Sequence, residues 1–310
     1  MRILVTGGAG FGGSGLTHAM LSQGHEVTVF DLVSPGHADL LADVIEHRGL
    51  RYRWQALQDI KPSDIDGHDI VVHMAAQADV PMGFESPRYS TIQNVDAIVC
   101  LLEAIRLSSS PPRLVYAGSG NEYGRHVYLP IDDRHPLTPH NPYSFSKAAA
   151  ELAVWAWHRC YDLPVVVMNN GAVIGPNMRR EIFIYKWLTL AIRGKPITLE
   201  GGDQTRDVTY VDDVVQAWSL AVNAPDEKVL GKKFFVSYGQ ELTVREIADI
   251  CLEVAGSSVP IMPAPDRPGE EGQREDFDTS LAREVLGYRP QVGPVEGISR
   301  TFDWITSIHS

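Results

Sequence analysis

The chain has 310 residues, of which 44% are hydrophobic and 21% charged, the balance of an ordinary soluble globular protein. Its formal net charge is −12, which argues against nucleic acid as the main partner because phosphate backbones are bound by basic surfaces. No apolar run approaches the ~18 residues of a membrane span, and no signal peptide is visible. We therefore expect a cytoplasmic protein with neither a membrane nor a nucleic acid as partner.

The three cysteines give no sign of a cross-linked or metal-binding framework. Cys100, Cys160 and Cys251 lie far apart and form no CxxC pair. An odd number of widely spaced thiols predicts neither disulfides nor a zinc site, and we expect no metal.

Short apolar runs alternate with helical patterns through the first two-thirds of the chain. The predicted strands are Arg2–Thr6, Glu26–Asp31, Ile70–His73, Leu114–Ala117 and Val165–Asn169, and the predicted helices are Gly15–Gln23, Asn94–Ser108 and Ser144–Tyr161. Strands that alternate with helices indicate an α/β fold, a doubly wound parallel sheet of the Rossmann type with helices on both faces.

The clearest local signal is a glycine-rich turn after the first strand, with Gly7, Gly10 and Gly13 at GxxGxxG spacing. Glycine permits a tight turn and close approach to a pyrophosphate, which the positive end of the next helix attracts. The second strand ends in Asp31, where a carboxylate accepts hydrogen bonds from the adenosine ribose. Because this carboxylate repels the extra phosphate of NADP, the predicted cofactor is NAD. Asp59 either contacts the adenine or is a solvated loop acid.

After Gly175-Pro176 the chain becomes richer in loops, with helical patterns at Ile182–Arg193, Val244–Ala255 and Leu281–Val285. We predict that residues 1–176 form the NAD-binding domain and that residues 177–310 form mainly a smaller C-terminal α/β lobe for the substrate, over the carboxyl ends of the strands. Arg206–Ala221 has the pattern of a strand end plus a helix. The segment at about 206–222 is therefore expected to return to the main sheet, so that the two lobes interleave.

A candidate catalytic set lies around the start of the third predicted helix. Tyr143 and Lys147 are four residues apart and share one helix face. Tyrosine alone is a poor base near neutral pH because its unperturbed pKa is ~10, but a nearby ammonium group stabilises the tyrosinate. We expect Lys147 to do this and also to hold the nicotinamide ribose. Ser119 follows a predicted strand and is expected to hydrogen-bond the same substrate oxygen as Tyr143.

These features resemble those of the extended short-chain dehydrogenase/reductases, the NAD-dependent nucleotide-sugar epimerases and dehydratases. The matching segments are Thr6–Phe11, His73–Gln77, Asn94-Val95, Ser119 with Tyr123-Gly124, Asn141–Tyr143 with Lys147, Gly175-Pro176, Arg206-Asp207 with Tyr210–Asp213, and Arg267–Glu270. The resemblance implies a tightly held NAD, a nucleotide-sugar substrate and a homodimer. It adds Phe11, Ala75, Ala76 and Asn94 to the cofactor site. It makes Tyr143 the base, with Lys147 and Ser119 as its partners, and it assigns the substrate diphosphate to Arg206 and Arg267.

The sequence departs from the family's pattern at several positions. Gly12 stands where a bulky aliphatic residue is usual, and Asn169 and Ala172 stand where arginine and asparagine are usual. The missing asparagine removes one usual substrate contact, for which Asn170 is a candidate replacement.

The segment after Ser119 bears most on the type of reaction. Family 4,6-dehydratases carry an acid pair directly after the hydroxyl residue, and decarboxylases usually carry a glutamate at the second of these positions; here the two are Gly120 and Asn121. Glu122 comes one residue late, which in an extended chain is the opposite face unless Gly120 allows a bulge. We therefore expect oxidation and reduction at C4 without elimination, with Asn121 beside the substrate.

The leading hypothesis is an NAD-dependent 4-epimerase that acts on a UDP-hexose or a UDP-uronic acid. The adjacent Arg179 and Arg180 would bind the carboxylate of a uronic acid, or would instead begin a solvated helix. One alternative is a dehydratase or decarboxylase that uses Glu122. An alternative of another class is a catalytically idle NAD-binding sensor or scaffold.

Overall fold

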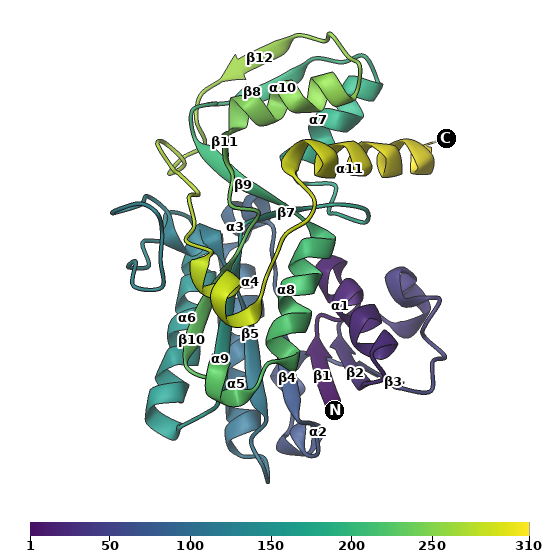
Figure 1. Cartoon of the computed structure of the whole chain (residues 1–310), viewed down its shortest axis with the longest axis vertical. Coiled ribbons are helices and arrows are strands. Elements are labelled where there is room, and N and C mark those ends of the chain that lie inside the picture. The colour runs from purple at the N-terminus through teal and green to yellow at the C-terminus, as the bar shows by residue number, and fades with distance from the viewer. Residues whose placement is uncertain (310) are drawn as a thin grey trace.

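The computed structural model describes residues 1–309, and its centre is a seven-stranded parallel sheet (Figure 1). In spatial order the strands are β3 (Leu50–Trp54), β2 (Glu26–Asp31), β1 (Arg2–Thr6), β4 (Ile70–His73), β5 (Arg113–Ser119), β6 (Val165–Asn170) and β10 (Lys232–Val236). Strand order reverses between β1 and β4, so the crevice in which ligands bind lies at that point. The predicted doubly wound Rossmann fold is confirmed.

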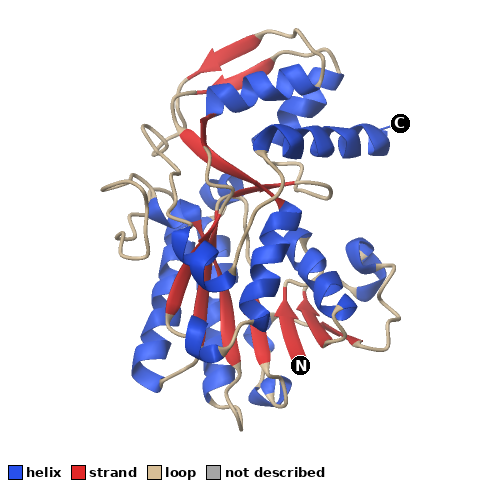
Figure 2. Ribbon diagram, in the orientation of Figure 1, coloured by secondary structure: helices blue, strands red, loops and turns tan. Residues whose placement is uncertain are grey.

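Helices cover both faces of this sheet (Figure 2). On one face α1 (Phe11–Ser22) packs against α8 (Val211–Asn223), with Leu16, Met20 and Trp218 in the shared core. The other face carries α2 (Pro62–Ile65), α5 (Ala97–Arg106) and α6 (Pro142–Tyr161), together with the short α3 (Val80–Glu85) and α4 (Pro87–Thr91) against α6. Helix α8 and strand β10, which the short α9 (Asp226–Val229) connects, bring the chain back to the main sheet after it has entered the second lobe.

The second lobe sits beyond the carboxyl ends of the sheet strands (Figure 1). It has a small sheet in the order β11 (Glu241–Thr243), β9 (Thr205–Tyr210), β7 (Ala172–Ile174) and a parallel pair, β8 (Ile197–Glu200) and β12 (Ile261–Ala264). Helices α7 (Phe183–Ile192), α10 (Val244–Val254) and α11 (Pro294–His309) pack there around a core that includes Ile184, Leu188, Ile247 and Ile298. Across residues 1–309, no helix combines the length and the apolar character needed to cross a membrane.

Several element boundaries differ from the predicted ones. Helix α1 begins at Phe11 rather than Gly15, because Gly10 is its N-cap and the glycine turn forms the first helical turn. The predicted helix Asn94–Ser108 is a π-helical segment, Ile92–Asp96, followed by α5. Strand β5 runs two residues past its predicted end at Ala117, which makes Ser119 its last residue.

Candidate active site

A cavity of about 550 Å³ opens between the two lobes at the carboxyl ends of the sheet strands. It is the place where open α/β sheets bind ligands. The predicted site residues that line it are Gly7, Gly10, Phe11, Gly13, Ala76, Ser119, Asn121, Tyr143, Lys147, Asn170, Arg179, Arg206 and Arg267. The fold thus brings segments from most of the chain's length to one site.

The glycine turn leaves no room for side chains. Gly7 has a φ of +71°, and a Cβ there would lie 2.6 Å from the backbone nitrogen of Ala75. A Cβ on Gly13 would lie 2.1 Å from the carbonyl oxygen of Gly7. Helix α1 starts at this turn, so its unpaired N–H groups and positive end face the space beside the glycines. This cradle fits a pyrophosphate.

Asp31 lies at the end of β2 and is held against the glycine turn. Its Oδ2 accepts a hydrogen bond from the backbone nitrogen of Ala9 at 2.9 Å, and its Oδ1 accepts one from that of Val33 at 3.0 Å. Each carboxylate oxygen keeps a further acceptor position, which suits the two hydroxyls of an adenosine ribose. The residues around the turn therefore fit NAD.

Four predicted cofactor residues are not among those that line the cavity: Asp31, Asp59, Ala75 and Asn94. Asp59 is exposed at the end of a 3₁₀ turn. Asn94 is buried, and its amide accepts from the backbone nitrogen of Gln77 at 2.7 Å and donates to the Gln77 carbonyl at 2.9 Å and to Ser146 at 2.8 Å. Asn94 thus fixes the loop after β4, which contributes Ala76 to the cavity wall.

Ser119 and Tyr143 are brought together by the end of β5 and the start of α6. Asn141 caps α6: its side chain accepts from the Ser144 nitrogen at 2.8 Å, and the Ser144 hydroxyl accepts from the Asn141 nitrogen at 2.9 Å. This capping box fixes the helical turn that carries Tyr143. Burial raises the pKa of Tyr143, whereas its hydrogen bond with Ser119 and the charge of Arg179 lower this pKa. The fold thus brings the Ser119 and Tyr143 hydroxyls together, and their binding of a common substrate oxygen stays a prediction.

Lys147 lies one turn further along α6 and faces inward. Its Nζ donates to the Ala117 carbonyl at 2.5 Å and lies 4.7 Å from the centre of the Tyr116 ring. Burial lowers the pKa of Lys147, while the charges of Glu122 and Glu151 raise it. The effect of Lys147 on Tyr143 stays a prediction, because the groups that shift the pKa of Tyr143 here are Ser119, Arg179 and Glu122.

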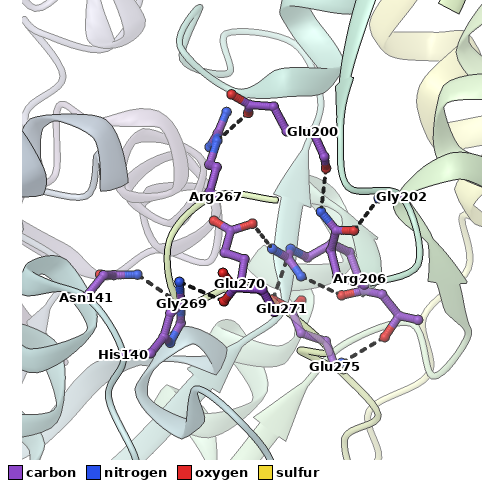
Figure 3. Close-up of polar contacts among 12 residues, drawn as sticks. His140, Asn141, Glu200, Gly202, Arg206, Arg267, Gly269, Glu270, Glu271 and Glu275 are labelled. Atoms are coloured by element: carbon purple, nitrogen blue, oxygen red, sulfur yellow. Dashed lines mark hydrogen bonds and ion pairs between the residues drawn. The ribbon is translucent and has the colours of Figure 1, made fainter. Parts of the chain in front are cut away.

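The two arginines assigned to the diphosphate are each paired with glutamates (Figure 3). Arg206 donates from Nη2 to Glu270 at 2.9 Å, and its Nε lies 3.4 Å from Glu275. Arg267 donates from Nε to Glu200. All three glutamates line the cavity, and the binding of a diphosphate by these two arginines stays a prediction. No local motif marks Glu200 or Glu275 in the sequence, whereas Glu270 ends the matching segment Arg267–Glu270.

Arg179 and Arg180 have different positions. Arg179 lines the cavity, and among residues 1–309 it has no carboxylate partner within ion-pair distance. Arg180 is exposed and does not line the cavity. Of these two adjacent arginines, Arg179 is therefore the one that can contact a ligand in this cavity.

Two of the residues that depart from the family's pattern, Gly12 and Ala172, line the cavity. The methyl group of Met74 lies 3.2 Å from where a Cβ of Gly12 would be, so the methionine fills the space beside this glycine. Asn170 and Ala172 both line the cavity, and the Oδ1 of Asn170 accepts a hydrogen bond from Trp218 at 3.0 Å. The tryptophan thereby fixes the orientation of the Asn170 amide.

The side-chain space at Gly120 is filled by an aromatic ring from the C-terminal part of the chain. A Cβ on Gly120 would lie 2.4 Å from the Cζ of Phe277, and the Phe277 ring stacks on Phe235 at 5.3 Å between centroids. Glu122 is fully buried and does not line the cavity. Neither Gly120 nor Glu122 therefore presents a carboxyl group to a ligand in the cavity.

The fold and the cavity together define a dinucleotide-binding enzyme with a serine–tyrosine–lysine set beside the cofactor cradle. Residues 3–237 match the NAD dependent epimerase/dehydratase family. The chain therefore belongs to this family of enzymes, and its cofactor is NAD.

Relatives with two kinds of reaction cover almost the whole chain. The UDP-glucose 4-epimerase of Mycolicibacterium smegmatis is 32% identical over 98% of this chain and 98% of its own length. The dTDP-glucose 4,6-dehydratase of Streptomyces niveus is 33% identical over 98% of this chain and 92% of its own length. The crystal structure of UDP-glucose 4-epimerase from Thermotoga maritima with UDP-glucose covers 100% of both chains at 27% identity, with a TM-score of 0.89. The chain is thus an NAD-dependent enzyme of the epimerase and dehydratase class.

Proposed function

We propose that this enzyme is a nucleotide-sugar 4-epimerase that acts on a UDP-hexose or a UDP-uronic acid. NAD, when bound, supplies the acceptor and then the donor of the hydride at C4. Tyr143 removes the proton of the C4 hydroxyl and later returns it, and Ser119 hydrogen-bonds the same oxygen. Lys147 holds the nicotinamide ribose and adds positive charge near Tyr143.

The other assignments follow from the walls of the cavity and from Asp31, which lies beside the glycine turn. The glycine turn holds the pyrophosphate of NAD, and Asp31 holds its adenosine ribose. Arg206 and Arg267 hold the diphosphate of the sugar nucleotide, for which guanidinium geometry is well suited. Asn121 and Asn170 line the same cavity as Tyr143 and provide amides for sugar hydroxyls.

One observation favours epimerisation over dehydration: the position of Phe277. Elimination of water requires an acid as well as a base next to the sugar, and family dehydratases carry their acid pair at the positions of Gly120 and Asn121. Here the Phe277 ring occupies the side-chain space of Gly120, and the next side chain is a neutral amide. Glu122, the acid of the alternative hypothesis, lies outside the cavity.

A direct test is incubation of the purified enzyme with UDP-, TDP-, GDP-, CDP- and ADP-sugars, followed by NMR of the products. The proposal predicts a pair of C4 epimers, with UDP-sugars preferred and no net consumption of NAD. A 4-keto-6-deoxy sugar as the only product would contradict it.

The role of Phe277 gives a first prediction. Gly120→Asp is expected to destabilise the protein by about 1–3 kcal/mol, because the added side chain overlaps the aromatic ring. It is not expected to produce a 4-keto-6-deoxy sugar. Thermal unfolding and product NMR measure the two effects, and Gly120→Asp combined with Phe277→Ala should recover part of the stability. A stable Gly120→Asp variant that forms a 4-keto-6-deoxy sugar would show that the Phe277 ring does not prevent dehydration.

Arg179 gives a prediction about the sugar. If the substrate carries a C6 carboxylate, Arg179→Gln should lower kcat/KM for a UDP-uronic acid by about 10–100-fold, the worth of a hydrogen bond to a charged group. Turnover of the matching UDP-hexose should change only a few-fold. Arg180→Gln is the control, because Arg180 is exposed outside the cavity. Equal losses on both substrates would remove the carboxylate-binding role.

We also propose a homodimer that forms through the exposed apolar side of α6. Phe145 and Leu152, seven residues apart on one helix face, are 53% and 54% exposed. Leu152→Glu is expected to yield monomers in light scattering, while Lys186→Glu on the exposed side of α7 should leave the mass unchanged. A monomeric wild-type protein at micromolar concentration would rule this interface out.

A further inference from the structure

Behind the catalytic side chains lies a buried polar cluster that takes no part in lining the cavity. Its members are Glu122, Tyr123, Glu151, Asn169 and Lys233, which come from the turn after β5, from α6, from β6 and from β10. Each is at most 8% exposed. We refer to these five residues as the inner cluster.

Glu151 is the centre of the inner cluster and is fully supplied with donors. Lys233 Nζ lies 2.6 Å from its Oε1, Trp155 Nε1 donates to the same oxygen at 3.0 Å, and Asn169 Nδ2 donates to its Oε2 at 3.0 Å. Lys233 and Asn169 also reach the Tyr123 hydroxyl, at 3.1 and 2.8 Å. The negative charge of Glu151 is therefore compensated by Lys233.

Glu122 has no such donors. Neither of its oxygens accepts a hydrogen bond from a donor in the described part of the chain, and the hydrogen-bonding group that it meets is the Glu151 carboxyl. Two buried carboxyl groups can hydrogen-bond only when one of them carries a proton. Since Glu151 already has a cation and several donors, the proton belongs on Glu122. Burial and the charge of Glu151 raise the pKa of Glu122 well above its ordinary value, in agreement with this assignment.

The charge of Glu122 matters because of where it lies. Tyr143, Lys147 and Glu151 are spaced by four residues and share one face of α6. If Glu122 were ionised, its negative charge would raise the pKa of Tyr143 and that of Lys147. The other charged or titratable groups that face it are Lys233 from β10, Tyr116 from β5 and Tyr123 on its own turn. An ionised Glu122 would thus oppose the formation of a base at Tyr143.

We propose that Glu122 is a positioning residue for Tyr143 and Lys147: it holds a proton at neutral pH, donates it in a hydrogen bond to Glu151, and so keeps uncompensated negative charge away from both. The positioning role rests on the proposed function of Tyr143. The protonation of Glu122 does not, and it can be measured without turnover.

The first test is infrared spectroscopy of the NAD-loaded enzyme, with isotope-labelled glutamate, at neutral pH. We expect a carbonyl band of a protonated carboxyl group that disappears in Glu122→Gln. The band should also disappear in Glu151→Gln, because Glu122 would then ionise beside Lys233. It should persist in Glu296→Gln, where an exposed glutamate is replaced. A spectrum that Glu122→Gln leaves unchanged would show that Glu122 is ionised and would overturn the proposal.

The second test compares pH profiles of kcat/KM. Glu122→Val, which removes the donor to Glu151, should lower kcat/KM by about tenfold, the worth of a hydrogen bond to a charged group. It should also move the acidic limb of the profile, which reports the ionisation of the base Tyr143, to higher pH. Glu122→Gln, whose amide can still donate, should recover most of the loss. If Glu122→Val lowers only the unfolding temperature and leaves the pH profile in place, the positioning role is wrong. If Tyr143 is not the base, neither Glu122 variant moves the pH profile, but the infrared band of the protonated Glu122 is still present. A failure of the proposed function of Tyr143 therefore differs from a failure of the protonation of Glu122.

Discussion

Replacing Tyr143 with phenylalanine is expected to lower kcat by about 10²–10⁴-fold, the usual contribution of a positioned acid–base group. The reason is that in the proposed mechanism the Tyr143 phenolate accepts the proton, in the cavity next to Ser119, and phenylalanine keeps the ring but cannot take the proton. NAD content and nucleotide-sugar affinity should stay close to those of the wild type. Initial rates of C4 epimer formation measure the effect.

The matched control for this variant is Tyr128→Phe, since Tyr128 is exposed and lies outside the cavity. That variant should turn over at the wild-type rate. If Tyr143→Phe kept more than a tenth of the activity, another group would have to be the base and the proposed mechanism would fail.

Replacing Gly13 with alanine is expected to weaken NAD binding by about 10–100-fold, because overpacking of this kind typically costs 1–3 kcal/mol. The added Cβ would lie 2.1 Å from the Gly7 carbonyl oxygen, so the turn proposed to hold the pyrophosphate would have to open. The NAD content of the purified protein and titration calorimetry measure the loss.

Gly36→Ala is the control for this second variant, because no atom lies within 4 Å of the added methyl group there. It should bind NAD like the wild type. Wild-type affinity in Gly13→Ala would mean that the glycine turn is not the pyrophosphate site.

Much of the main sheet could be predicted from the sequence because its strands are short runs of branched apolar residues. Ile70–His73 was predicted with the bounds that β4 has. Strand β10 was not predicted, because its KKFFV sequence carries two lysines. The burial of Lys233 in that strand depends on its ion pair with Glu151, a partner distant in the sequence. Local patterns do not contain such a partner.

In the candidate site, too, some features could be predicted from the sequence and others could not. Ser119 and Tyr143 could be predicted because each occupies a fixed place at the end of a strand or the start of a helix. The hydrogen bond from Lys147 to the Ala117 carbonyl and the presence of Phe277 beside Gly120 could not, since both depend on segments that meet only in the folded chain. The glutamates that pair with Arg206 and Arg267 belong to this second group.

In the proposed reaction this enzyme oxidises and re-reduces one carbon of the sugar without eliminating water. The most direct measurement uses a UDP-hexose and a UDP-uronic acid that carry deuterium at C4, with NMR of the products. We expect that a C4 epimer forms and that the deuterium remains at C4. A product that has lost the deuterium, or a 4-keto-6-deoxy sugar, would contradict it.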